Sequence, residues 1–167
     1  YDVNFIKDEI SVNINLSKFP IEILNSTKTP TRRQVLQILM SLFDPIGLIQ
    51  FLTSKIKLVY HRSCIAKKAW DEEIDQADLV LWNKCLSWIK LLSSIKIPRP
   101  YCNHNSEVCK VEMWNFGDAG TEMMCGVIYL RFLNKKDEQI GLTLVHAKSF
   151  TVPVKHNRTI PQLELEV

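Results

Sequence analysis

Glycine is scarce in this sequence, with only five in 167 residues, and the five do not cluster into a glycine-rich phosphate loop. Long apolar runs are also missing, since none approaches the roughly 18 residues that a membrane-spanning helix needs. The chain starts with neither an initiator Met nor a signal-peptide pattern, and it stops in what looks like the first turn of an amphipathic helix. We therefore expect an internal, intracellular piece of a longer protein, neither secreted nor bound to membranes.

Paired cysteines are absent as well. The five cysteines are odd in number and widely spaced, which is typical of reduced intracellular thiols that act as small hydrophobic residues: Cys64, Cys85, Cys102, Cys109 and Cys125. Cys102, His104 and Cys109 lie close together, but three residues at this spacing match neither a paired Cys-x-x-Cys site nor a zinc knuckle. No structural zinc is expected.

Strong charge of either sign is missing too. The formal net charge is +3 and the pI is near 8.6, a mild basic bias that permits a nucleic-acid partner without establishing one. With 46% hydrophobic and 23% charged residues, the chain can bury one core or two smaller ones.

The first part of the chain is predicted to form a hairpin and three helices. Residues 3–24 alternate loosely between apolar and polar, as half-buried strands do. Thr31 and Gln34 form a capping box that predicts a helix from Arg32 to the Asp44-Pro45 break. A second helix is expected from Pro45 or Gly47 to just before Trp70.

The surface of the second predicted helix carries five basic residues that are candidates for contacting nucleic-acid phosphates, although a solvated helix face carries such residues equally often: Lys55, Lys57, Arg62, Lys67 and Lys68. The acidic run 71–75 favours the start of a third helix, which Pro98 and Pro100 end. We expect a linker from Ile97 and a domain boundary near residue 100, which divides the chain into 1–100 and 101–167.

After this boundary the pattern changes to strands. Residues 111–116, 125–132 and 140–147 are β-rich runs joined by short polar turns, which predicts a three-stranded antiparallel meander. A polar loop over 148–159 and a helix beginning near Leu163 should follow. His146, on the third strand, is expected to be a packed or paired sheet residue. The predicted class is therefore α/β, more narrowly α+β.

Two acids stand out in this second part. Asp118 closes the first strand of the meander, and Glu164 lies at the start of the last predicted helix. Carboxylates at a strand end and on a facing helix can hold Mg²⁺ for phosphodiester cleavage. The plainer alternative is that Asp118 only begins a turn and that Glu164 is only an acidic residue in the first turn of a helix. Spacing alone does not separate the two interpretations.

A resemblance bears on this choice. Residues 31–48, TRRQVLQILMSLFDPIGL, resemble the block that follows the reverse transcriptase palm in BEL/Pao retrotransposons. The resemblance continues in the same order over nearly the whole chain, through WDEEI at 70–74, IPR at 97–99, FGDA at 116–119, AKS at 147–149 and TIPQLEL at 159–165.

The resemblance implies a piece of a Pol polyprotein that runs from a reverse transcriptase tail into the first half of a ribonuclease H domain. Asp118 and Glu164 would then be the first two catalytic acids and metal ligands, with Mg²⁺, or Mn²⁺, as cofactor and an RNA/DNA hybrid or template-primer as partner. The other acids would lie past Val167, so this fragment is expected to be inactive. A cytoplasmic virus-like particle or the nucleus is the implied location.

Gly117 and Gly120 depart from the family, which usually has Cys and Ser at these positions, and they suggest a decayed or divergent copy. Two other functions stay open. Asp118-Ala119-Gly120 resembles the Asp-Thr/Ser-Gly loop of retrotransposon aspartic peptidases, although Ala119 lacks the hydroxyl that braces such a loop. Alternatively, the chain is a non-catalytic nucleic-acid-binding scaffold or a domesticated remnant.

Overall fold

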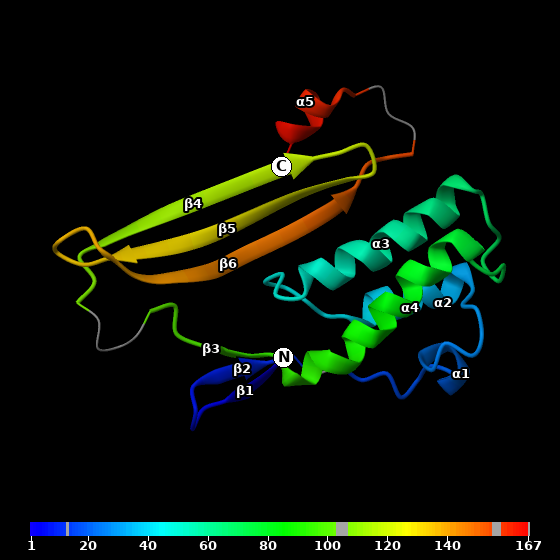
Figure 1. Cartoon of the computed structure of the whole chain (residues 1–167), viewed down its shortest axis with the longest axis horizontal. Helices are drawn as coiled ribbons and strands as arrows, with labels where there is room; N and C mark the ends of the chain where they lie inside the picture. Colours follow the sequence, from blue (N-terminus) through cyan, green and yellow to red (C-terminus); the bar gives the residue numbers. More distant parts are fainter. Residues whose placement is uncertain (13, 103–106, 155–157, 167) are drawn as a thin grey trace.

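The computed structural model describes residues 1–12, 14–102, 107–154 and 158–166. The chain forms a helical region with a small sheet at one end, beside a long three-stranded sheet (Figure 1). Among the described residues, no helix is long and apolar enough to cross a membrane. The α+β class predicted from the sequence is confirmed.

The small sheet begins with the predicted hairpin, made of β1 (Asp2–Asn4) and β2 (Glu9–Ser11). A third strand, β3 (Lys96–Pro98), pairs antiparallel with β2. The expectation of a linker from Ile97 was therefore wrong for residues 97 and 98. Pro98 lies at the end of an edge strand, where its missing N–H interrupts no ladder. A short helix, α1 (Ile21–Leu24), replaces the end of the predicted alternating segment.

The first long helix, α2 (Arg32–Ser41), confirms the predicted capping box. The Gln34 backbone N–H donates to the Thr31 hydroxyl over 3.3 Å, and the Thr31 N–H donates to the Gln34 side chain over 2.8 Å. These two bonds satisfy amides that a helix start leaves without intrahelical partners. The helix ends before Asp44, as predicted.

The next two helices are α3 (Gln50–Ile65) and α4 (Gln76–Leu91), the latter followed by the single 3-10 turn η1 (Leu92–Ser94). α3 starts later than predicted because residues 44–49 form a turn. It ends earlier because Lys67, with a φ of +55°, reverses the chain. α4 begins directly after the acidic run, as predicted.

The helices enclose the main hydrophobic core. Trp82 of α4 is fully buried at its centre. The buried apolar members of this core are Val12, Ile23, Val35, Ile38, Leu39, Leu42, Ile49, Leu52, Ile56, Val59, Ile74, Trp82, Cys85, Leu86, Ile89 and Leu92. Removal of so much apolar surface from water is the main force that stabilises this region.

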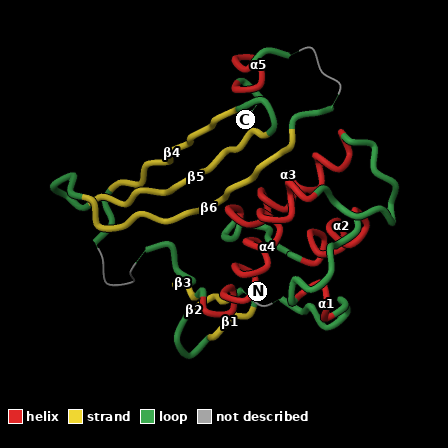
Figure 2. The backbone as a smooth tube through the Cα atoms, turned by 45° about the vertical axis from the view of Figure 1, so that its right-hand side comes forward, coloured by secondary structure: helices red, strands yellow, loops and turns green. Residues whose placement is uncertain are grey.

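The long sheet confirms the predicted meander, with each strand longer than its apolar run. Its strands are β4 (Lys110–Ala119), β5 (Met123–Leu133) and β6 (Gln139–Thr151), antiparallel in the order β4-β5-β6. A helix, α5 (Ile160–Glu164), then begins slightly earlier than expected and lies beside the end of β4 (Figures 1 and 2).

The two regions meet where α3 and the turn before it lie along β6 (Figure 2). The Ala147 N–H donates to the Ile46 carbonyl over 2.9 Å. Gly47 has a φ of +83°, and a Cβ there would lie 2.1 Å from the Ala147 carbonyl oxygen, so only glycine fits this contact. The domain boundary near residue 100 stays a prediction.

Candidate functional site

Asp118 is the penultimate residue of β4, and its side chain is exposed. Its cross-strand partner in β5 is Cys125, which in turn faces Ser149 of β6. Ser149 bonds to side chains of α3, so these three residues lie on the α3 face of the sheet. Among the described residues, no hydrogen bond or ion pair joins the Asp118 carboxylate to another side chain, which leaves its oxygens available to a cation.

Glu164 is the last residue of α5 and is also exposed. Its neighbour Leu163 is buried against Ala119 and Val152, and these contacts hold the short helix on the sheet. Because side chains alternate along a strand, Ala119 faces the side opposite to Asp118. The fold thus brings the two elements together at the end of β4, with Asp118 on one face and the α5 contact on the other.

The chemistry of these two acids suits a hard divalent cation. Both carboxylates are solvent-accessible, and neither takes part in an ion pair with a described Lys or Arg. Mg²⁺ is commonly bound through one or two carboxylates, several waters and substrate phosphates. Within the described ranges no group of three or more His, Cys, Asp or Glu side chains is gathered. A metal site shared by these two acids stays a prediction.

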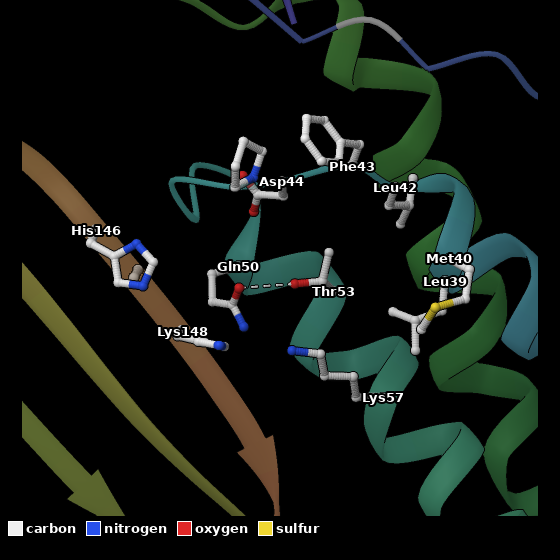
Figure 3. Close-up of a pocket in the computed structure, with 12 residues that line it drawn as sticks. Leu39, Met40, Leu42, Phe43, Asp44, Gln50, Thr53, Lys57, His146 and Lys148 are labelled. Carbon is white, nitrogen blue, oxygen red and sulfur yellow. Dashed lines mark hydrogen bonds between the residues drawn. The ribbon is translucent and has the colours of Figure 1, made fainter.

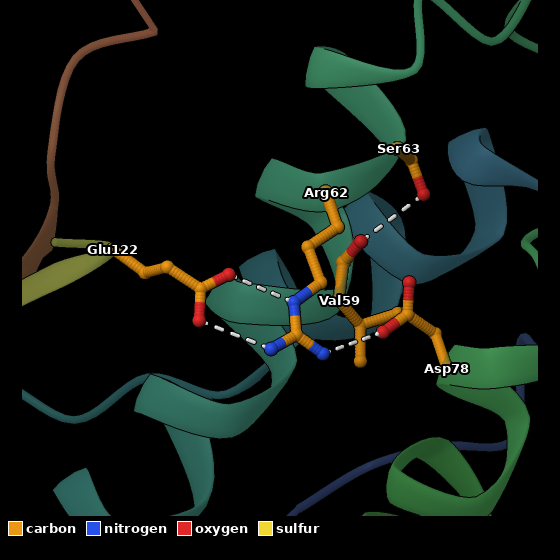
Figure 4. Close-up of polar contacts among 5 residues, drawn as sticks. All are labelled: Val59, Arg62, Ser63, Asp78 and Glu122. Atoms are coloured by element: carbon orange, nitrogen blue, oxygen red, sulfur yellow. Dashed lines mark hydrogen bonds and ion pairs between the residues drawn. The ribbon is translucent and has the colours of Figure 1, made fainter.

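Of the five basic candidates, Arg62 is the most firmly engaged within the protein (Figure 4). Its Nε and Nη2 donate to Glu122 over 2.9 and 3.1 Å, and its Nη1 donates to Asp78 over 2.9 Å. The bonds to Glu122, and then those to Asp78, raise the pKa of Arg62 above its usual range. Asp78 is almost fully buried, so Arg62 supplies its counter-charge.

Lys68 is engaged in a similar way, because its ammonium lies 3.0 Å from Glu72 and 2.8 Å from Asp75. Lys55 and Lys67 are exposed. Lys57 is half-buried and donates to the Ser149 carbonyl over 2.8 Å, at the contact between α3 and β6. Contact of these five residues with nucleic acid stays a prediction, and the geometry favours Lys55, Lys57 and Lys67 over the two paired residues.

Sequence reasoning missed the role of Asp44, which it treated only as a helix stop. One Asp44 oxygen accepts the Gly47 and Leu48 amides over 3.0 and 2.9 Å, and the other accepts the Ile49 amide over 3.0 Å. The Tyr1 hydroxyl also donates to this carboxylate. The Phe-Asp-Pro-Ile-Gly-Leu stretch is therefore the turn that leads into α3. The signal was present, since Asp before Pro and Gly is a typical turn pattern.

The cysteines differ from one another. All five are free, but only Cys85 is buried in the core, where desolvation raises the pKa of its thiol to about 11. Cys64 and Cys102 are partly buried, and Cys109 and Cys125 are exposed. The expectation that the cysteines act as small buried residues is therefore met fully only by Cys85. His104, one of three residues considered for zinc, lies outside the described residues.

Asp118-Ala119-Gly120, the peptidase-like triplet, ends a strand and starts a hairpin. Ala119 is buried beneath α5, and the Gly120 N–H donates to the Met123 carbonyl over 2.8 Å. The triplet thus closes the β4–β5 turn. No described feature supports peptidase chemistry.

The chain is an α+β protein in which a long antiparallel meander is followed by a short helix beside its first strand. Comparison with known families is specific: the sequence model of the Pao retrotransposon-like RNaseH-like domain matches residues 31–166. The chain belongs to this family, as its resemblance to BEL/Pao elements implied. No curated protein and no solved structure is similar enough to count as a match.

Proposed function

We propose that the chain is a piece of a retrotransposon Pol polyprotein whose parent cleaves the RNA strand of RNA/DNA hybrids. The observation that carries the proposal is the family match, which spans the helical region from α2 onward together with the meander. The strand-end acid Asp118 and the placement of α5 beside β4 support it. Such a hybrid would form in a cytoplasmic virus-like particle or in the nucleus.

In this proposal Asp118 and Glu164 are the metal ligands. When bound, Mg²⁺, or Mn²⁺ in its place, neutralises developing charge on the scissile phosphate and activates the attacking water. Asp118 and Glu164 would hold the cation at the end of β4, where α5 packs against the strand. Because only two acids gather there among the described residues, we expect weak metal binding and no cleavage by this chain alone.

The helical region has a different part in the proposal. We assign residues 1–100 to a reverse transcriptase tail that positions the hybrid, and residues 101–167 to the RNase H-like half. The contacts of the helical region with the hybrid would be mostly with phosphates and with the 2′-hydroxyls that distinguish RNA from DNA. The rest of the Pol polyprotein is the expected protein partner.

Paramagnetic Mn²⁺ tests the metal site directly. Added to the ¹⁵N-labelled chain, it should broaden the amide signals around Asp118 and around Glu164 at the same low concentration. Asp118→Asn should abolish the broadening at both places. Glu112→Gln is the matched control, because Glu112 lies on the same strand but is paired with Lys110 and Arg131. Broadening at only one of the two acids would contradict a shared site.

A non-catalytic scaffold is the second candidate, favoured by Lys57 of α3 and Lys148 of β6, which form no ion pair in the described part of the chain. The two candidates separate on metal dependence. For an RNase H-type parent, Mg²⁺ should strengthen hybrid binding, and Asp118→Asn should remove that gain. For a scaffold, Mg²⁺ should only weaken hybrid binding by competing for phosphates, and to the same extent in the wild type and in Asp118→Asn.

A further inference from the structure

A cavity of about 340 Å³ lies between the end of α2, the start of α3 and β6, away from Asp118 and Glu164 (Figure 3). One wall is apolar and comes from Leu39, Met40 and Phe43. The opposite side is polar and cationic, with Lys57 of α3 facing His146 and Lys148 of β6. A cavity of this composition suits a ligand that is partly anionic and partly carbon-rich.

The two lysines in this cavity lack a neutralising partner. The Lys57 ammonium donates to the Ser149 carbonyl and, over 3.4 Å, to its hydroxyl, while Lys148 lies over the Phe150 ring at 5.0 Å. In the described part of the chain neither lysine forms an ion pair. Burial, and then repulsion from Lys148, lower the pKa of Lys57.

Asp44 is the one carboxylate lining the cavity, and its oxygens are already occupied. They accept three backbone amides of the turn and the Tyr1 hydroxyl, which uses the roughly four acceptor positions of a carboxylate. Asp44 therefore moderates the positive potential without cancelling it. The half-buried Lys57 and the exposed Lys148 both line this cavity, and their two positive charges favour an incoming anion.

We propose that this cavity is a phosphate site in which Lys57 and Lys148 hold one backbone phosphate of a nucleic-acid strand. The nucleic-acid occupant rests on the proposed function. Lysine binds phosphate as a point charge, so two ammonium groups from opposite walls can contact separate phosphate oxygens. The apolar wall of Leu39, Met40 and Phe43 suits the sugar carbons on either side of that phosphate. His146 and Lys148 both line this cavity from β6.

Inorganic phosphate is the first probe. Titrated into the 167-residue chain, it should shift the NMR signals of the Lys57 and Lys148 side-chain amino groups together, whereas Lys136, exposed in the β5–β6 turn, should not respond. Bound phosphate should also raise the pKa of Lys57 in the same experiment. Lysine signals that do not move would overturn the phosphate site.

An RNA/DNA hybrid is the second probe, with its affinity measured over a range of salt. Loss of one phosphate contact should weaken binding regardless of sequence and reduce the salt slope by about one. We expect this from Lys148→Gln and from Lys57→Gln with Lys148→Gln, and not from Lys136→Gln. Lys148→Gln guards against a folding defect, because Lys148 is exposed and makes no described hydrogen bond.

The outcomes separate this site from the proposed function. If the wild-type chain binds the hybrid and all variants keep the same slope, the cavity is not where the phosphate binds, and the proposed function stands. If phosphate shifts both lysines but the hybrid does not bind, the nucleic-acid occupant falls together with the proposed function.

Discussion

The helical region and the long sheet differ in how much apolar surface they bury. The helices surround one core with the fully buried Trp82 at its centre, whereas the sheet has a small buried cluster of Ala119, Val152 and Leu163. Met113 and Phe116 of β4 are 71% and 52% exposed. We therefore expect most of the stability to come from the helical core, while the sheet depends on its backbone ladders and on contacts with α3 and α5.

The largest expected effect contrasts two tryptophans. Trp82→Ala should lower the free energy of unfolding by roughly 3–5 kcal/mol, because it empties the centre of the helical core. Trp114→Ala, on the sheet, should cost about 1 kcal/mol, since its ring is 41% exposed and interacts mainly with Phe116 and Arg131. Urea unfolding measures both values. Equal losses would show that the sheet is as tightly built as the helices.

A second contrast concerns two glycines. Gly47→Ala should cost roughly 3 kcal/mol, because it combines a positive φ with a clash against the Ala147 carbonyl. Gly120→Ala is the matched control and should stay within about 0.5 kcal/mol, as a Cβ there meets only the Met123 carbonyl at 3.7 Å. Thermal unfolding of the two variants decides the matter. A tolerated Gly47→Ala would mean that the two regions are not joined at this turn.

A third contrast compares two arginine pairs. Arg62→Ala removes the counter-charge of the buried Asp78 and the link to Glu122, at an expected cost of about 2 kcal/mol. Arg33→Ala breaks a pair with Asp71 that is open to solvent, and it should cost clearly less stability than Arg62→Ala. The double variant Arg62→Ala with Asp78→Asn should recover part of the loss. No recovery would indicate that Asp78 does not need the charge of Arg62.

The smallest expected effect is on how the stability of the fold depends on pH. Burial lowers the pKa of His61 in α3 below its ordinary value near 6.5, and the Glu122 charge only partly opposes this. The unfolded chain therefore binds a proton first as the pH falls below about 6.5, so stability is present above that pH and is lost progressively below it. Urea midpoints at pH 7.5, 6 and 5 should show this loss. His61→Asn should flatten the curve, and an unchanged slope would contradict it.

Local signals predicted much of the fold. Thr31 and Gln34 predicted the start of α2, and β-rich runs joined by polar turns predicted all three strands of the meander. Long-range pairing was not predictable, because residues 96–98 form a strand only by pairing with β2, which lies far away in the sequence. The same is true of the candidate site. Asp118 could be placed at a strand end, but the pairing of Arg62 with Glu122, 60 positions apart, leaves no local pattern.

The contact between α3 and β6 has a consequence for the order of folding. Gln50 and Ser149, which bond across it, are 99 positions apart. Closing so long a loop costs entropy that only its final contacts repay, whereas the helices and hairpins close short loops. The hydrophobic core of the helical region can thus form while the strands of the long sheet are still being synthesised. We therefore expect the docking of β6 onto the turn at Gly47 to be the last step, and a chain interrupted before Ala147 should keep its helices.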